Sequence, residues 1–170
     1  MTGSDNKWYV LRVRPRHEKT IAERLSPKYE VYLPLIKKYN KWSDRIKCVE
    51  TPLFSGYLFI KTSIKEKYYI LENQGVSSFI QFANKPAIIR DQEIRAIQLM
   101  LEQPSTLEIS DGYAFSKGEN IQITRGVFAG VEGKVANIKN RSRLYVAIEQ
   151  LGKIISVEID TESIEKHKKI

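Results

Sequence analysis

The sequence predicts an α+β protein with two domains, a mixed first domain and a small all-β second domain. Segments with helical and strand periodicity alternate over residues 7–103. Residues 104–113, PSTLEISDGY, have no period and little apolar content, which predicts a linker. Only short strand-like segments follow, separated by glycine or polar turns, and this pattern is typical of a small β-barrel over residues 114–163.

The first domain begins, after a polar tail, with a strand and a helix. Residues 8–13, WYVLRV, predict the strand. We expect the helix over residues 15–25, because Pro15 suits the first turn, where its missing N–H costs nothing. Ile21, Ala22 and Leu25 then form one apolar stripe.

Two longer strands are predicted next, joined by a polar segment. Residues 29–40 form the first of them, with Pro34 at an edge or a bend. Residues 41–48 are polar and predict a loop or hairpin tip, and residues 49–62 return as a strand. Within that strand, alternate residues of YLFI at 57–60 face opposite sides of the sheet, so one pair can lie in the core.

The rest of the first domain contains two helices separated by strands. Ser63 is a candidate cap for a short helix, residues 76–83 predict a strand, and residues 84–89 predict a turn with a short extension. Asp91 caps a last helix that ends near Gln103. The apolar residues of that helix share one face: Ile94, Ile97, Met100 and Leu101.

The barrel is built from four predicted strands, over residues 119–126, 132–139, 143–150 and 153–160. These strands are rich in the β-branched residues that favour extended backbone. The last six residues, EKHKKI, predict a solvated end.

Composition indicates a basic protein for which we expect no enzymatic role. The net charge of +8 points to nucleic acid, an anionic membrane or an acidic protein as partner. We expect no secretory leader, no apolar run is long enough to cross a bilayer, and the single cysteine, Cys48, excludes an internal disulfide framework. We therefore expect a cytoplasmic protein. His17 and His167 lie in different predicted domains, and we expect no metal, no cofactor and no catalytic residue.

Basic residues crowd the end of the first strand and the helix that follows it. Arginine and lysine hold phosphates, and arginine also reads guanine edges, so this segment predicts contact with nucleic acid. The alternative is a solvated helix face. The residues concerned are Arg12, Arg14, Arg16, His17, Lys19 and Arg24.

Aromatic residues form a second candidate site. Tyr57, Phe59 and Phe82 can share one face of the sheet, with Phe54 nearby. An exposed apolar patch of this kind usually marks a protein partner, and aromatic rings beside basic residues can also stack single-stranded bases. The alternative is a sheet that is packed on both faces.

Three segments, in this order, resemble the N-terminal domain of the NusG family of transcription elongation factors: WYVLRVRPRHEKTIAERL, PLFSGYLFI and GVSSFIQF. A fourth segment, FSKGENIQITRGVFAGVEGKV, resembles the KOW motif that follows that domain. The resemblance covers residues 8–160. It implies an NGN domain, an antiparallel four-stranded sheet with helices, joined by a linker to a KOW β-barrel.

The resemblance also implies a function. NusG-like N-terminal domains bind the clamp helices of the large RNA polymerase subunit, close the clamp and suppress pausing. The positions that match the family's polymerase contacts are Phe54, Tyr57, Phe59 and Phe82. The KOW domain of the family recruits a ribosomal protein or the termination factor Rho. Phe128 matches a loop position used for such contacts, and it can equally fill the barrel.

Within the family, the chain looks most like the specialised paralogues of the UpxY and RfaH type. UpxY proteins promote transcription of long capsular polysaccharide operons, and RfaH touches the exposed non-template DNA strand. Arg14, Arg16, His17 and Arg24 fall where such paralogues contact DNA. The family suggests a monomer. Two alternatives stay open, a housekeeping NusG elongation factor and a KOW-containing RNA-binding module.

Overall fold

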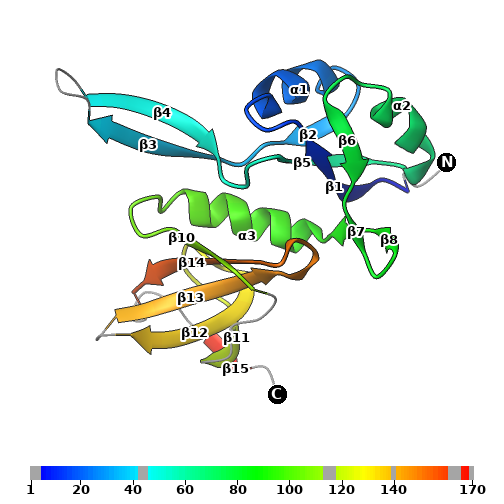
Figure 1. Ribbon diagram of the computed structural model, residues 1–170. Helices are drawn as coiled ribbons and strands as arrows, with labels where there is room; N and C mark the ends of the chain where they lie inside the picture. Colours follow the sequence, from blue (N-terminus) through cyan, green and yellow to red (C-terminus); the bar gives the residue numbers. More distant parts are fainter. Residues whose placement is uncertain (1–4, 42–45, 113–117, 139–140, 161–165, 169–170) are drawn as a thin grey trace. The chain divides into compact units, whose positions relative to one another are not determined.

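The computed structural model describes residues 5–41, 46–112, 118–138, 141–160 and 166–168 (Figure 1). The chain divides into two units, Met1–Arg90 and Asp91–Ile170. Short helices and several antiparallel sheets make up the described residues, which confirms the predicted α+β class. The division falls at residue 90, whereas the sequence places the end of the first domain at residue 103. The limits of the functional domains stay a prediction.

The first unit is built on an antiparallel sheet with the strand order β2-β5-β1-β6. The central strands are β1 (Lys7–Val13) and β5 (Tyr57–Thr62), and the outer ones are β2 (Glu30–Tyr32) and β6 (Val76–Phe79). A short fifth strand, β9 (Ile88–Ile89), pairs with the start of β1. The four-stranded path agrees with the sheet that the sequence implied.

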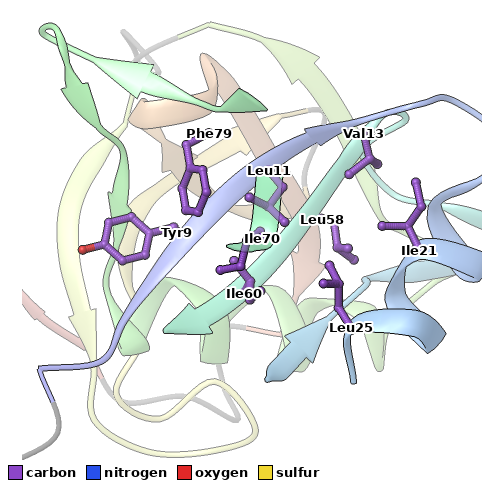
Figure 2. Close-up of a cluster of buried hydrophobic side chains, with 9 residues drawn as sticks. All are labelled: Tyr9, Leu11, Val13, Ile21, Leu25, Leu58, Ile60, Ile70 and Phe79. Atoms are coloured by element: carbon purple, nitrogen blue, oxygen red, sulfur yellow. The ribbon is translucent and has the colours of Figure 1, made fainter. Parts of the chain in front are cut away.

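Helices cover one face of this sheet. Helix α1 (Glu18–Leu25) and the pair η1 (Ile64–Glu66) and α2 (Lys67–Leu71) bring apolar side chains against β1 and β5 (Figure 2). Burying these side chains supplies the main stabilisation of the unit. The predicted alternation is confirmed, because two of the YLFI residues lie in this core. The cluster consists of Tyr9, Leu11, Val13, Ile21, Leu25, Leu58, Ile60, Ile70 and Phe79.

Helix α1 begins three residues later than predicted. Arg16 has φ of 68°, a left-handed conformation that a helix cannot contain. Residues 15–17 therefore form a turn, and His17 takes the cap position of a helix that starts at Glu18. The predicted cap of the next helix is confirmed, since the Ser63 hydroxyl accepts a hydrogen bond from the Lys65 amide at 3.4 Å.

A long hairpin extends from the first unit (Figure 1). It consists of β3 (Leu35–Lys41) and β4 (Ile46–Pro52). The loop or hairpin tip was predicted over residues 41–48; residues 42–45 lie outside the described residues, whereas Lys41 ends β3 and residues 46–48 belong to β4. The strands predicted over residues 29–40 and 49–62 are each divided, the first at Pro34, where the sequence predicted an edge or a bend. Pro34 separates β2 from β3, and a turn that ends at Gly56, with φ of 78°, separates β4 from β5. Proline and left-handed glycine both interrupt a strand ladder.

The strand predicted over residues 76–83 is also divided. It forms β6 and then β7 (Gln81–Phe82), which pairs with β8 (Lys85–Pro86) in a small hairpin of its own. The two connecting residues, Ala83 and Asn84, have φ of 49° and 60°. Positive φ at both central residues is the signature of a two-residue hairpin turn.

Among the described residues, the second unit contains one α-helix and a six-stranded antiparallel sheet. Helix α3 (Asp91–Leu101) lies against β14 and buries its predicted apolar residues, apart from the half-buried Leu101. The four strands predicted for the barrel are confirmed. The sheet runs in the order β10 (Glu108–Asp111), β14 (Lys153–Ile159), β13 (Arg141–Ile148), β12 (Glu132–Ile138), β11 (Glu119–Ile123) and β15 (Lys166–Lys168), with η2 (Glu149–Leu151) between β13 and β14.

Both edge strands of this sheet lie where the sequence predicted no structure. Strand β10 forms within the segment expected to be a linker and pairs with β14. Strand β15 forms within the expected solvated end and pairs with β11. All four side chains of β10 are exposed, so the strand has no alternation of apolar and polar residues that a sequence pattern could reveal.

Candidate protein and nucleic-acid interface

The face of the first sheet that lies opposite the helices carries aromatic rings. Phe59 lies directly across from Tyr32 in the β2–β5 ladder, and their ring centroids are 6.0 Å apart. Phe54, in the turn before β5, packs edge-on against Phe59 at 6.1 Å. Tyr57 lies two residues before Phe59 and therefore on the same face of β5. We call Tyr32, Phe54, Tyr57 and Phe59 the aromatic face.

The four aromatic residues predicted as a protein-binding patch differ in exposure. Phe59 is fully buried and Phe54 is 3% exposed, so these two rings serve packing. Tyr57 is half-buried. Phe82 is 46% exposed and lies on the separate β7–β8 hairpin. The structure therefore brings Phe54 and Phe59 into contact, and leaves Tyr57 and Phe82 as the members with accessible surface.

Tyr32 belongs to the aromatic face although the sequence analysis did not single it out. Burial raises the pKa of its phenol well above the usual range. Strand β2 has only three residues, too few for a periodic pattern to show which side chains face inward. Only its register against β5, where Tyr32 opposes Phe59, reveals the role of this ring.

Basic side chains border the aromatic face along β1 and β5. Arg12 lies directly opposite Tyr57 in the β1–β5 ladder. Four residue pairs further along the same ladder, the Lys61 ammonium lies over the Trp8 ring, 5.6 Å from its centroid. An aromatic surface with cations at its border can receive both apolar and anionic groups of a partner.

The predicted DNA contacts form a second cluster at the end of β1. All four side chains are exposed. The Nδ1–H of His17 donates to the Pro15 carbonyl at 3.2 Å, because a carbonyl oxygen can only accept. The Arg24 guanidinium donates to the Gln74 carbonyl at 2.8 Å. We call Arg14, Arg16, His17 and Arg24 the basic cluster.

A buried carboxylate positions the turn between the two clusters. Glu18 is only 2% exposed, and its Oε1 accepts a hydrogen bond from the Gly56 amide at 2.8 Å. The bond ties the turn before β5 to the first residue of α1. Sequence analysis missed Glu18, although its spacing from Ile21 and Leu25 places it on the inner face of the helix.

In the second unit, the loop between β11 and β12 contains the predicted partner contact. Phe128 is buried, at 3% exposed, which agrees with the interpretation that its ring fills the barrel. The neighbouring Val127 is 60% exposed and is the accessible apolar side chain beside it. Among the described residues, no helix is long and apolar enough to cross a membrane.

Comparisons with known proteins agree with this architecture. The family model described as "Transcription termination factor nusG" matches residues 6–98. The chain is 26% identical to the transcription termination/antitermination protein NusG of Borreliella burgdorferi, over 94% of this chain and 97% of that protein. It is 25% identical to the NusG of Lactococcus lactis, over 97% of this chain and 95% of that protein.

Among solved structures, one reported as "Domain interaction in Thermotoga maritima NusG" has the same fold. It has a TM-score of 0.55 and 17% identity, and the alignment covers 96% of this chain and 98% of that one. The family model covers more than half of the 170 residues. The chain therefore belongs to the NusG family of transcription termination and antitermination factors.

Proposed function

We propose that the protein is a specialised antitermination factor that binds the clamp helices of bacterial RNA polymerase and contacts the exposed non-template DNA strand. The observation that carries this proposal is the position of Arg12, directly opposite Tyr57 across β1 and β5. Because Arg14 follows Arg12 by two residues, one strand end joins the aromatic face to the basic cluster. A partner that presents an apolar protein surface next to DNA could contact the aromatic face and the basic cluster together.

The aromatic face supplies the polymerase contact in this proposal. Tyr57 and Phe82 offer accessible ring surface, while the buried Phe54 and Phe59 hold the shape of the face beneath it. Burial of apolar area contributes about 25 cal/mol per Å² before the costs of association. A few aromatic anchors of this kind usually dominate an interface.

The basic cluster supplies the DNA contact. Its arginines are exposed: Arg14 and Arg16 lie before α1, and Arg24 lies in the last turn of that helix. Arginines in such positions can hold the phosphates of a single strand. By holding both the clamp and the non-template strand, the factor suppresses pausing. Suppressed pausing matters most in long operons, and we assign the protein to operons of the capsular polysaccharide type.

A housekeeping NusG role is the second candidate. It is favoured by the relatives, which match nearly the whole chain and are named as termination/antitermination proteins. Dependence on the sequence of the non-template strand distinguishes the two functions, because only the specialised factor reads that strand.

We propose that the KOW unit recruits a further partner, such as a ribosomal protein, through the loop between β11 and β12. Val127 is the exposed apolar side chain of that loop, and the ring of the neighbouring Phe128 is buried. In this arrangement Phe128 acts on the partner through the shape of the loop.

The polymerase contact is tested with Tyr57→Ala. Binding to a reconstituted bacterial elongation complex, measured by gel shift, should weaken at least tenfold, which corresponds to about 1.4 kcal/mol. Tyr39→Ala is the matched control, because Tyr39 is 71% exposed on the β3–β4 hairpin, away from the aromatic face. Equal affinities of both variants and the parent protein would refute the polymerase contact.

Scrambled non-template strands, compared in the same experiment, test the specialised role. Affinity that depends on the sequence of the strand supports the specialised factor. Affinity that does not change with the sequence of the strand supports a housekeeping NusG function.

A further inference from the structure

Strand β10 lies at one edge of the sheet in the second unit, where it pairs with β14. All four side chains of β10 are exposed, whereas residues 154–157 of β14 are buried. The strand therefore adds little apolar burial to the unit, although it covers the backbone edge of a strand that belongs to the core. An element with few buried apolar contacts opens at a lower free energy than the core that it covers.

Polar contacts hold β10 in place at both of its ends. At the first end, the Arg143 guanidinium binds the Thr106 carbonyl and pairs with the Glu108 carboxylate. At the other end, the Lys153 ammonium pairs with the Asp111 carboxylate. The side chains of Glu108 and Asp111 are 71% and 87% exposed. Salt in the solvent therefore screens both ion pairs, and other carboxylates have access to the same two cations.

The cation that binds Glu108 is also fixed by contacts outside β10. Nη2 of Arg143 donates to the Ser156 hydroxyl at 3.1 Å, and Nη1 lies 3.6 Å from the Glu158 carboxylate, and both of these residues belong to β14. Nε of Arg143 is buried and has no hydrogen-bond partner among the described residues. A buried donor without a partner costs free energy, so this guanidinium has further capacity to bind a carboxylate.

The pairing of β10 with β14 shows which strand this edge accepts. The two strands are antiparallel, with Glu108 opposite Ser156 and Asp111 opposite Lys153. Because the two carboxylates of β10 are three positions apart, they lie on opposite faces of the strand. A strand that replaces β10 must therefore be extended and antiparallel to β14, and it must carry one carboxylate on each face, three positions apart.

We propose that β10 is a releasable strap, and that the edge of β14 beneath it binds an extended acidic segment of a partner protein in its place. Backbone hydrogen bonds along β14 supply affinity, and Arg143 and Lys153 select the carboxylates. The strap competes with the partner, because the chain holds it beside β14 at a high effective concentration. This surface is separate from the loop between β11 and β12, and the inference does not depend on the polymerase or DNA contacts.

The test is binding of a fluorescein-labelled peptide with the sequence of residues 106–112, TLEISDG, to the full-length protein, followed by fluorescence anisotropy. Glu108→Gln combined with Asp111→Asn weakens the strap and leaves β14, Arg143 and Lys153 unchanged. We expect this strap variant to bind the peptide at least about tenfold more tightly than the parent protein does. Glu102→Gln combined with Glu149→Gln is the matched control, because it removes the same charge at exposed positions outside β10, and it should bind like the parent protein.

Equal affinities of the strap variant and the parent protein would overturn the proposal. The peptide TLQISNG, which lacks both carboxylates, should bind the strap variant about tenfold more weakly than TLEISDG does. If both peptides bind equally, the edge does not select an acidic segment. Amide signals of the ¹⁵N-labelled strap variant locate the peptide, and we expect those of residues 154–157 to shift while those of β11 stay in place. Shifts confined to β11 and β15, at the opposite edge of the sheet, would also overturn the proposal.

Discussion

At the residue scale, single carboxylates of the first unit fix the positions of neighbouring elements. Glu18 is buried and binds one backbone amide across the fold. Glu66, at the junction of η1 and α2, accepts from the Lys28 ammonium at 3.1 Å and from the Tyr29 hydroxyl at 3.0 Å. Lys28 also lies 5.2 Å from the centroids of the Tyr29 and Tyr69 rings. One carboxylate thus joins the segment after α1 to the segment before α2.

Because of Glu66, the stability of the first unit should fall at acid pH. The hydrogen bond from Lys28, followed by that from Tyr29, lowers the pKa of its carboxyl below 4.5. A carboxyl whose pKa is lower in the folded state adds stability above its unfolded pKa and loses it as pH falls through the folded value. Glu66→Gln should therefore lower Tm at about pH 6 and have a smaller effect at about pH 3.

The measurement is thermal unfolding followed by circular dichroism at several pH values. Glu72→Gln, an exposed position directly after α2, is the matched control and should show no such convergence. If the Tm difference between Glu66→Gln and the parent protein is the same at both pH values, the two hydrogen bonds do not stabilise the charged carboxylate.

At the element scale, polar side chains hold strand β10 on the second sheet. Arg143 of β13 is buried, and its Nη2 donates to the Thr106 carbonyl at 2.7 Å and to the Ser156 hydroxyl at 3.1 Å. Its Nη1 pairs with Glu108 at 3.2 Å and with Glu158 at 3.6 Å. One guanidinium therefore joins three segments, namely β14, β10 and the residues that precede β10.

Arg143→Gln should release β10 from the sheet. Removing one partner of a buried polar network leaves the other partners without hydrogen bonds. We therefore expect the free energy of unfolding of the second unit to fall by about 2–3 kcal/mol. Hydrogen exchange of the β10 amides should accelerate more than that of β12 and β13. Lys153→Gln is the comparison, because it breaks only the exposed pair with Asp111 and should change stability by less than about 1 kcal/mol. Equal exchange in both variants would contradict the role of Arg143.

These elements show which parts of the fold a sequence pattern can predict. The alternation at residues 57–60 correctly predicted that one pair, Leu58 and Ile60, lies in the core. It could not distinguish an exposed opposite face from a packed one, and Phe59 on that face is buried as well. Strands β10 and β15 were missed, since they are short and polar and depend on pairing with β14 and β11. The break at Pro34 agrees with the edge or bend that the proline predicted, whereas the break at Gly56 was missed.

The candidate site divides in the same way. The basic cluster falls within residues 14–24, so its residue types alone predicted an anionic partner. The neighbourhood of Arg12 and Tyr57 follows from strand register, which no local pattern can reveal. The four predicted aromatic residues differ in burial, and the sequence could not show this. Composition cannot distinguish a buried ring such as Phe59 from an accessible ring such as Tyr57.

At the scale of the whole molecule, the proposed function has the net charge of +8 and the aromatic face act on different parts of one partner. Apolar burial depends little on salt, whereas phosphate contacts weaken steeply as salt rises. Binding to an elongation complex should therefore separate into a component that salt barely changes and a component that salt removes. The two components can be measured apart, because the non-template strand can be left out when the complex is assembled.

The three arginines of the basic cluster predict the size of the salt-dependent component. At about 0.7 per phosphate contact, they should add about 2 to the slope of log K against log salt when the non-template strand is present. Replacing Arg14, Arg16 and Arg24 together by glutamine should reduce the slope to that of the complex without the strand. Tyr57→Ala should instead lower affinity at every salt concentration without changing the slope. Identical slopes with and without the strand would mean that the cluster does not contact non-template DNA, and the protein would then act through the polymerase contact alone.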